Sequence, residues 1–462
     1  MEKYIFYDLE TTGISPAFDQ PLQFAAIVTD LDFKEIKRID IRCQLAPHIL
    51  PSPQALAVTG VRPSQLQNTN LPNAFEFAQE VQAFIELWAP AIWIGYNSIA
   101  FDEAMLRQMF YQNLQPNIFA TQFHDNTRLD VMKMVFAVHA TEPKILKWPI
   151  NEKGKISFKL DQLAPENGFP SHNAHDALGD VEATIFIAKK IKQESPDLYQ
   201  KLFDARDKER NLQLLKSFAP VDVTFRFGGN APKTYTGCFC GNPKNNKNMV
   251  GFFDLNQSGP MDLINGTKQD IMEAITKSPQ RIRSLRLNQA DSIRPASNAD
   301  NVANHISETI RNNIAFQDLV SECLVEKYAA TEETDSPVEE KIFGSFYTNS
   351  DKNILQQFQD SSWQERLSLL EDVQDERIQQ LGRRLIAFNA AELLDERHHN
   401  IIRKFISEKW DAKEEGIKWT TISSVKRQLG ELAEDGFDQD LLDEMKTFYQ
   451  KRLDDQGFSF RF

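Results

Sequence analysis

The chain has 462 residues, 41% of them hydrophobic, and a formal net charge of −14. This length exceeds one ordinary domain and predicts about three, with enough apolar residues for real cores. The charge argues against a protein that coats nucleic acid indiscriminately. No apolar run approaches the ~20 residues of a membrane span, no signal-peptide pattern is present, and four cysteines are too few for a disulfide framework, so we expect a soluble protein that is not secreted.

Basic residues concentrate in the middle of the chain. The net charges of residues 1–200, 201–300 and 301–462 are −7, +5 and −12. A polyanionic ligand would therefore have to be met by a local groove, with metal ions neutralising an acidic site. An acidic enzyme that acts on phosphates fits this distribution.

The first 195 residues combine strand and helix patterns. Strands are predicted at 3–13, 23–30, 35–43 and 91–95, and helices at 73–88, 102–111, 130–140, 160–166 and 176–192. Prolines at 47, 51 and 53 interrupt the pattern, and residues 58–63 are predicted to form a turn. Three successive strands predict a meander, and the whole pattern predicts a mixed α/β sheet flanked by helices.

The remainder of the chain divides in two. Short strand patterns at 221–227, 235–240 and 249–255, separated by Gly, Asn and Pro, predict a small β-rich unit. Residues 329–337 have few apolar side chains and predict a linker, after which the patterns are helical and charged. We therefore divide the chain into residues 1–195, 196–337 and 338–462.

The first strand carries two carboxylates close together. Asp8 and Glu10 are two residues apart, so in a strand both point to the same face at the end of an apolar run. Two like charges so close need a counter-ion, and Mg²⁺ binds through one or two carboxylates plus substrate phosphates. The alternative is a strand that ends in a solvated Asp-x-Glu turn.

Three further polar residues fall at the ends of predicted elements. Asp102 follows a buried strand and begins a helix, a position that also suits an Asp favoured by the helix dipole. Asp180 borders the apolar stripe of the helix at 176–192, where a carboxylate is costly unless it is paired or solvated. His175 precedes that helix, and a neutral imidazole can accept a proton from water near pH 7.

These residues form a recognisable series. Asp8-x-Glu10, Asn97-x-x-x-Phe101-Asp102 and His175-x-x-x-x-Asp180, in that order, resemble the motifs of the DEDDh exonucleases, which have a ribonuclease-H-like fold. The resemblance is closest to the bacterial exonuclease I family and extends along the whole chain. It implies a ribonuclease-H-like domain, a small SH3-like β domain and an all-α C-terminal domain.

The resemblance also implies a mechanism. Asp8, Glu10 and Asp180 would hold one Mg²⁺, and Asp8 with Asp102 would complete a second metal position, with Mn²⁺ as a substitute. Two cations can stabilise the attacking and departing oxygens of a phosphodiester. His175 would act as general base, a role worth roughly 10²–10⁴ in rate.

Five residues are predicted to contact or position the substrate. The backbone around Leu9, Glu10 and Thr11 would cradle the terminal nucleotide, with Glu10 also meeting it, and Asn97 would orient the loop that carries Asp102. Lys159 and Arg107 would steady phosphates; the alternative for both is a solvated cation on the surface. The basic middle segment is predicted to form a wall along the single strand of DNA. Its residues are Arg226, Lys233, Lys244, Lys247, Arg281, Arg283 and Arg286, with the aromatics Phe227, Tyr235 and Phe239. At least half of these aromatics are expected to lie in the core instead.

Some positions differ from the family pattern. Thr12 stands where an aromatic residue is expected, and Ile118 and Gln122 lie in a stretch where the family offers aromatics to the strand. The family also binds the C-terminal tail of single-strand-binding protein through a basic ridge, and Glu142 falls where part of that ridge is expected. Single-strand-binding protein is therefore a predicted partner, although Glu142 is unfavourable for binding its tail.

The resulting hypothesis is a Mg²⁺-dependent 3′→5′ exonuclease for single-stranded DNA that acts in DNA repair. We expect a monomer in the bacterial cytoplasm or nucleoid. One alternative is a DEDDh exonuclease that prefers RNA 3′ ends, because no residue settles the sugar preference. Another is a nucleic-acid-binding scaffold without catalysis, which the five acidic and basic catalytic positions oppose.

Overall fold

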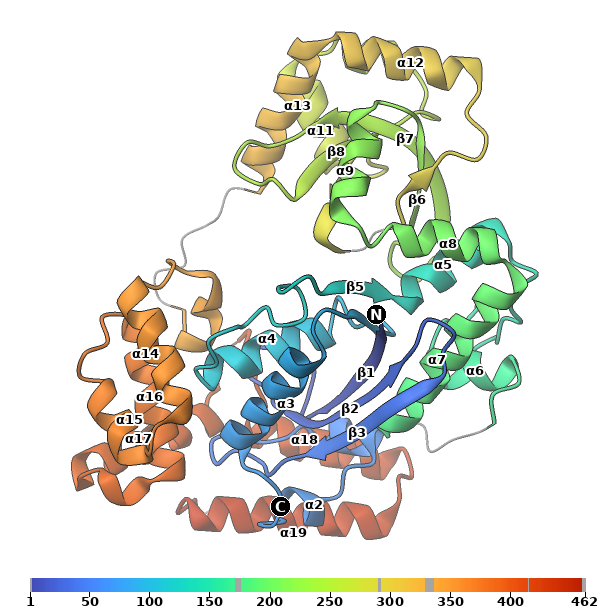
Figure 1. Ribbon diagram of the computed structural model, residues 1–462. Coiled ribbons are helices and arrows are strands. Elements are labelled where there is room, and N and C mark those ends of the chain that lie inside the picture. The colour runs from blue at the N-terminus through green and yellow to red at the C-terminus, as the bar shows by residue number, and fades with distance from the viewer. Residues whose placement is uncertain (1, 171–175, 290–291, 329–335, 414, 459–462) are drawn as a thin grey trace.

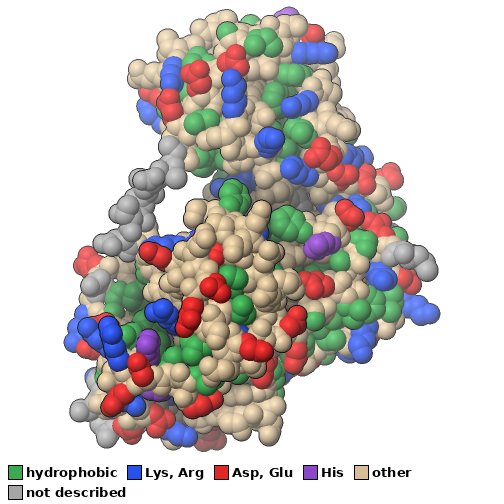
Figure 2. Space-filling model, turned by 60° about the vertical axis from the view of Figure 1, so that its left-hand side comes forward, with side chains coloured by type: hydrophobic (Ala, Val, Ile, Leu, Met, Phe, Trp, Pro, Cys, Tyr) green, Lys and Arg blue, Asp and Glu red, His purple; other side chains and the backbone are tan. Residues whose placement is uncertain are grey.

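A computed structural model describes residues 2–170, 176–289, 292–328, 336–413 and 415–458 (Figure 1). We call 1–195 the nuclease region, 196–337 the β-rich region and 338–462 the helical region, which keeps our division of the chain as a proposal. In Figure 1 the β-rich region lies above the nuclease sheet, and the helical region lies to the left of it and beneath it. Figure 2 shows Lys and Arg side chains spread over the β-rich region at the top.

The nuclease region is built on a five-stranded mixed sheet. Its strand order is β3-β2-β1-β4-β5; the first three strands pair antiparallel, and β4 and β5 run parallel to β1. The strands are β1 (Tyr4–Thr11), β2 (Pro21–Thr29), β3 (Glu35–Arg42), β4 (Ile92–Gly95) and β5 (Thr127–Asp130). The predicted meander and mixed sheet are confirmed, whereas β5 was not predicted, because Leu129 is the only apolar side chain among its four residues.

Helices cover both faces of this sheet. The strand period of two directs Ile5, Tyr7 and Leu9 of β1 to one face, and Tyr4 and Phe6 to the other. The first face packs on α3 (Ala74–Trp88) and α4 (Asp102–Gln112). The second packs on α5 (Val131–Thr141), α6 (Leu160–Glu166), α7 (Ala177–Glu194) and α8 (Pro196–Asp204).

The proline-rich stretch is not a simple interruption. Pro53 begins helix α1 (Pro53–Thr59) and Pro63 begins α2 (Pro63–Leu66). Proline suits the first helical position because its missing N–H would have no intrahelical partner there. The turn predicted at 58–63 is shorter in the structure, where residues 60–62 connect the two helices, with Gly60 in the left-handed conformation at φ 65°.

The β-rich region contains an antiparallel sheet in the order β10-β6-β7-β8-β9. Its strands are β6 (Val221–Phe225), β7 (Lys233–Gly241), β8 (Met249–Asp254), β9 (Ile282–Arg286) and β10 (Arg294–Pro295). Its helices are α9 (Lys208–Lys216), α10 (Pro260–Ile264), α11 (Lys268–Thr276), α12 (Asn301–Asn312), α13 (Ile314–Lys327) and the 3₁₀ turn η1 (Leu287–Gln289). The relation of this sheet to SH3-like domains stays a prediction, and most of the predicted linker lies outside the described residues.

The described part of the helical region contains helices and turns, as predicted. Its elements are η2 (Val338–Phe343), α14 (Asn349–Asp360), α15 (Trp363–Leu369), α16 (Glu376–Asn389), η3 (Ala391–Leu393), α17 (Glu396–Trp410), α18 (Ile422–Glu434) and α19 (Gln439–Asp455). Among the described residues, no helix combines the length and apolarity that crossing a membrane requires.

Candidate active site

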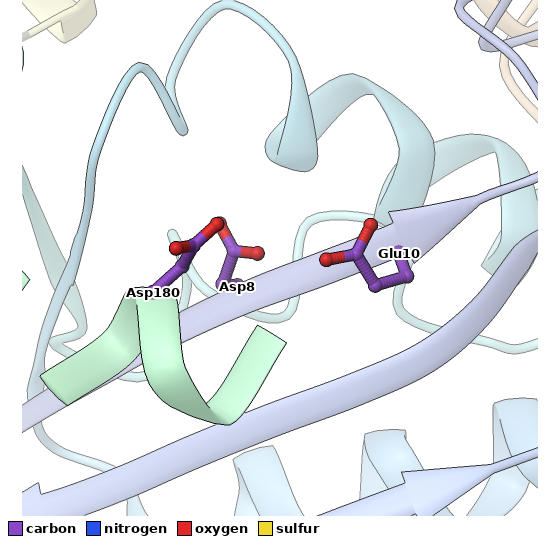
Figure 3. Close-up of side chains that lie close together, drawn as sticks. All are labelled: Asp8, Glu10 and Asp180. Carbon is purple, nitrogen blue, oxygen red and sulfur yellow. The ribbon is translucent and has the colours of Figure 1, made fainter. Parts of the chain in front are cut away.

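Three carboxylates converge at the end of β1. Asp8 and Glu10 continue the face of β1 that carries Tyr4 and Phe6, and this face is covered by α7, whose first turn holds Asp180. One carboxylate oxygen from each of the three lies within 4.8 Å of the others. Figure 3 shows the side chains of Asp8 and Asp180 side by side, with Glu10 further along the strand. The predicted same-face arrangement is therefore what the structure has.

The electrostatics of this cluster are unfavourable without a cation. Burial, followed by the charges of Asp102, Glu10 and Asp180, raises the pKa of Asp8 well above its usual value. Burial and then Asp180 raise the pKa of Glu10 to about 9. Carboxylate oxygens are the preferred ligands of hard divalent cations, so the donor set fits such an ion. A bound cation would favour the ionised carboxylates.

Asp102 lies beside the cluster but outside the set of three. Only 3% of it is exposed, and its Oδ1 accepts a hydrogen bond from the backbone N–H of Leu9 at 3.1 Å. Its charge contributes to the raised pKa of Asp8 and Glu10. The backbone of β1 thus holds this carboxylate next to the strand that carries the other two.

Asn97 shapes the loop that delivers Asp102. It adopts a left-handed conformation with φ 63°, and its carbonyl accepts hydrogen bonds from the N–H groups of Ala100 and Phe101. Its own N–H donates to Asp130 Oδ1 at 2.9 Å. These contacts turn the chain from β4 into α4, which is consistent with a positioning role for Asn97.

Three supporting carboxylates were not singled out from the sequence. Asp130, at the end of β5, also accepts from Met132 N–H at 3.0 Å and so caps α5. Asp176 stands at the N-cap position of α7, and its side chain accepts hydrogen bonds from Arg42 at 2.7 Å and from Gln23 Nε2 at 3.0 Å. The signal for both was a helix-start Asp, which is too common to single out a site.

The third supporting carboxylate is Glu103, the residue after Asp102. It is 1% exposed and accepts hydrogen bonds from the hydroxyls of Tyr7 and Thr121. Arg128 contributes an ion pair at 3.2 Å. Gln122 Nε2 also donates to Glu103, at 3.3 Å, so this side chain is directed into the protein rather than along a strand of substrate.

The other predicted site residues have different surroundings. His175 lies outside the described residues. The Thr11 hydroxyl donates to the carbonyl of Gly13 at 2.7 Å, and Lys159 is exposed at the start of α6. Arg107 is half-buried over the ring of Phe119, 5.9 Å from its centroid, and burial lowers its pKa. Roles for these residues toward a substrate stay predictions.

Part of the predicted basic wall is occupied by protein contacts. Arg283 is buried, pairs with Asp254 at 3.0 Å and lies 4.0 Å from the ring centroid of Tyr235. Arg226 packs over the ring of Phe158, at 4.8 Å, in the nuclease region. Phe239 belongs to the core, whereas Phe227 is 49% exposed. The division of the aromatics between core and surface agrees with expectation, but Arg283 is not a free surface cation.

Two segments of the chain match models of known protein families. Residues 5–188 match the "Exonuclease" model, and residues 336–452 match the "Exonuclease I C-terminal domain" model. The chain belongs to the exonuclease I family. The family identification made from the sequence motifs is thus confirmed, together with the mixed α/β fold and the helical C-terminal region.

Relatives and structures of the exonuclease I family match to different extents. Exodeoxyribonuclease I of Escherichia coli is 37% identical over 213 residues, which are 46% of this chain and 44% of that protein. Exodeoxyribonuclease I of Haemophilus influenzae is 29% identical over 453 residues, covering 90% of this chain and 89% of that protein. The first match therefore spans less than half of its relative, and the second spans most of it.

Solved structures share the fold along the chain. E. coli exonuclease I in complex with a dA16 oligonucleotide has a TM-score of 0.84 at 24% identity, covering 98% of this chain and 100% of that one. A structure of single-strand-binding protein with exonuclease I and an inhibitor has a TM-score of 0.82 at 24% identity, covering 99% and 100%. At this identity the likeness establishes the fold.

Proposed function

We propose that this chain is a divalent-metal-dependent 3′→5′ exonuclease that degrades single-stranded DNA to mononucleotides in DNA repair. The observation that carries the proposal is the convergence of Asp8, Glu10 and Asp180 within 4.8 Å on the fold of an exonuclease family. The names of the relatives, exodeoxyribonuclease I, support DNA as the substrate. The Escherichia coli structure with dA16 supports a single strand.

The metal is proposed to be Mg²⁺, with two ions per site and Mn²⁺ as a substitute. Asp8, Glu10 and Asp180 would hold one ion, and Asp8 with Asp102 the other. When bound, the ions supply an activated water and neutralise charge on the phosphate oxygens. The protein's contribution is to hold the carboxylates close together, through the backbone N–H of Leu9 at Asp102 and through the packing of α7 on β1.

His175 is proposed to accept the proton of the attacking water. Its neighbour Asp176 is fixed by Arg42 and Gln23, which attaches the start of α7 to β2 and β3. The charge of Asp176 also helps to raise the pKa of Glu10, so the residue that follows His175 lies near the cluster. Removing the imidazole is expected to lower the rate by roughly 10²–10⁴.

The test uses end-labelled single-stranded DNA and RNA of equal length, with Mg²⁺ and with chelator. The wild type is compared with Asp8→Asn, Asp180→Asn and His175→Ala. The control is Asp32→Asn, a carboxylate whose side chain is 93% exposed. We expect each ligand variant to lose more than ~100-fold in rate, as even groups that support metal ligands cost 10–100-fold.

Each arm tests one part of the proposal. Undiminished degradation by Asp8→Asn or Asp180→Asn would contradict the metal assignment. Faster degradation of RNA than of DNA would contradict DNA as the substrate. Equal digestion of DNA with a blocked and with a free 3′ end would contradict the 3′→5′ direction. Full activity in the presence of chelator would contradict the proposed metal cofactor.

We further propose that the protein is a monomer of the bacterial cytoplasm and binds the C-terminal tail of single-strand-binding protein. The structure of that protein with exonuclease I supports the partner. Glu142, at the end of α5, is exposed and acidic, which opposes an acidic tail at that point. Size-exclusion chromatography with a tail peptide, beside Glu142→Lys, is the measurement; tighter binding by the variant is expected.

A further inference from the structure

A groove extends from the carboxylate cluster between the nuclease and helical regions. One end is lined by Glu10 and Thr11 of β1, and one side by α1 and the loop that precedes α4. The lining is completed by residues 417–420 and by Ser424, Arg427 and Gln428 of α18. A segment more than 400 residues away in sequence thus lies in the same groove as a carboxylate of the cluster.

Two rings line this groove, Phe101 and Trp419. The indole N–H of Trp419 donates to the carbonyl of Lys409 at 2.8 Å, and its ring lies 4.9 Å from that of buried Phe18. The side chain is therefore held in one orientation, while it stays only partly buried. An anchored ring with an accessible part is suited to stacking on a planar ligand.

The side of the groove that carries Trp419 is attached to the nuclease region at its base. Gln428 of α18 accepts hydrogen bonds from the hydroxyl of Ser52 at 2.7 Å and from the N–H of Gln54 at 3.3 Å. Gln54 Nε2 donates to Glu431 at 2.8 Å. These contacts fix α18 against α1, so the groove is preformed in the described structure.

The exposed chemistry of the groove favours a nucleotide strand. Ile14 is 86% exposed and Val58 is 56% exposed, so apolar side chains are left uncovered next to an acidic cluster. Lys418 and Arg427 carry positive charge in the same lining, each beside a glutamate partner, Glu340 and Glu431 respectively. Apolar faces combined with positive charge match the bases and phosphates of a single strand.

Segment 10–15 of the nuclease region supplies no ring. Thr12 is fully buried, its hydroxyl donates to Asp19 at 2.9 Å, and its N–H donates to the carbonyl of Gln20. The position where an aromatic residue was expected therefore does not reach the groove. We propose that Trp419 of the helical region stacks on a base near the 3′ end of the strand and thereby sets substrate affinity. This inference rests on the proposed function of the same site.

Steady-state kinetics of Trp419→Ala on single-stranded oligonucleotides test the inference. One stacked base is worth about 1–3 kcal/mol, so KM should rise roughly 5- to 150-fold while kcat changes little. Trp419→Phe should recover most of the affinity. The control is Phe346→Ala, which removes a 98% exposed ring from the helical region outside the groove. An unchanged KM, or a fall in kcat alone, would overturn the inference.

Abasic substrates separate stacking from a general structural effect. Oligonucleotides with one abasic residue at each of the last few positions are compared on both proteins. At the stacked position the wild type should lose affinity and Trp419→Ala should lose none. If the variant's deficit persists with an abasic residue at every position, Trp419 does not stack on a base.

Binding distinguishes failure of the inference from failure of the proposed function. Quenching of an oligonucleotide that carries 2-aminopurine near its 3′ end is measured on Asp180→Asn, with and without Trp419→Ala. Loss of the quenching in the double variant supports the inference even if the wild type does not degrade DNA. Equal quenching in both proteins overturns it even if the wild type is an active exonuclease.

Discussion

The two regions that flank the nuclease region are attached to it by different chemistry. The helical region shares two apolar clusters with the nuclease region: Leu22, Leu45 and Ile49 pack with Trp410 and Tyr449. The other cluster joins Phe75, Tyr111 and Leu114 to Val338, Ile354 and Phe358. Burial of this kind is the dominant stabilising term in folding.

Beyond α8, which packs in the core under the nuclease sheet, the β-rich region is attached mainly through polar and cation–ring contacts. Its own cores contain no residue of the nuclease sheet among those described. Arg128 donates to the carbonyl of Asn288, Lys133 Nζ donates to the carbonyl of Gln289 at 2.6 Å, and Arg226 packs over Phe158. The comparison teaches that the helical region and α8 are part of the nuclease fold, whereas the sheet of the β-rich region is a neighbour held at a few points.

The largest expected effect comes from the helical interface. Trp410 is 1% exposed, and its indole N–H donates to the carbonyl of His48 at 3.0 Å. Trp410→Ala should cost up to about 5 kcal/mol in the free energy of unfolding. Urea unfolding should keep one transition for the nuclease and helical regions. An early separate transition of the helical region would contradict the shared core, and Phe346→Ala is the control.

A smaller loss is expected at the β-rich interface. Arg128→Met removes the charged partner of Glu103 and the contact to Asn288, and breaking a buried pair costs about 3 kcal/mol or more. Glu103 keeps its hydrogen bonds from Tyr7 and Thr121, so we expect a loss near the lower end of this range of unfolding free energies. Hydrogen exchange should show the loss in the nuclease region, with β7 and β8 still protected. Equal deprotection of both regions would contradict their separate cores.

Replacing Lys409 is expected to raise the free energy of unfolding by an amount that depends on pH. Its Nζ finds no hydrogen-bond partner among the described residues, and burial lowers its pKa from 10.5 to about 8. Because the unfolded chain binds this proton more tightly, the charged form opposes folding below pH 8. Lys409→Met should be more stable than the wild type by about 1–3 kcal/mol at pH 7.

The sign of this effect can be checked directly. The penalty in the wild type disappears as the pH rises from about 8 to 10.5, so the advantage of Lys409→Met should shrink over that range. Thermal unfolding of both proteins at a series of pH values is the measurement. Glu339 and Asp19 face Lys409, but each keeps other partners, Arg384 and Thr12 respectively. An advantage that grows with pH would contradict the assignment.

The smallest effect is expected at Lys133. Lys133→Met removes the hydrogen bond to the carbonyl of Gln289, and a single such bond contributes about 0.5–1.5 kcal/mol. The change should increase the rate of proteolysis around α9 and β6 without altering the unfolding of the helical region. A loss as large as that of Trp410→Ala would show that the two interfaces are equivalent after all.

Local patterns predicted much of the fold and of the site. The placement of Asp8 and Glu10 on one face follows from the strand period alone, and helices such as α6 appeared at their predicted residues. The order of the motifs at Asp102 and Asp180 was sufficient for the family. These features depend on neighbours in sequence, which periodicity records.

What only the tertiary structure decided depends on contacts between distant residues. The approach of Asp180 to Asp8, the support of Asn97 by Asp130 and the burial of Arg283 against Asp254 each join separate elements. Trp419 shares a groove with Glu10 only because α18 packs on α1. The sequence by itself determined the residue types and their spacing, and so which carboxylates were candidates for the site, because both are local properties. The partners of those side chains follow from packing, which no local pattern contains.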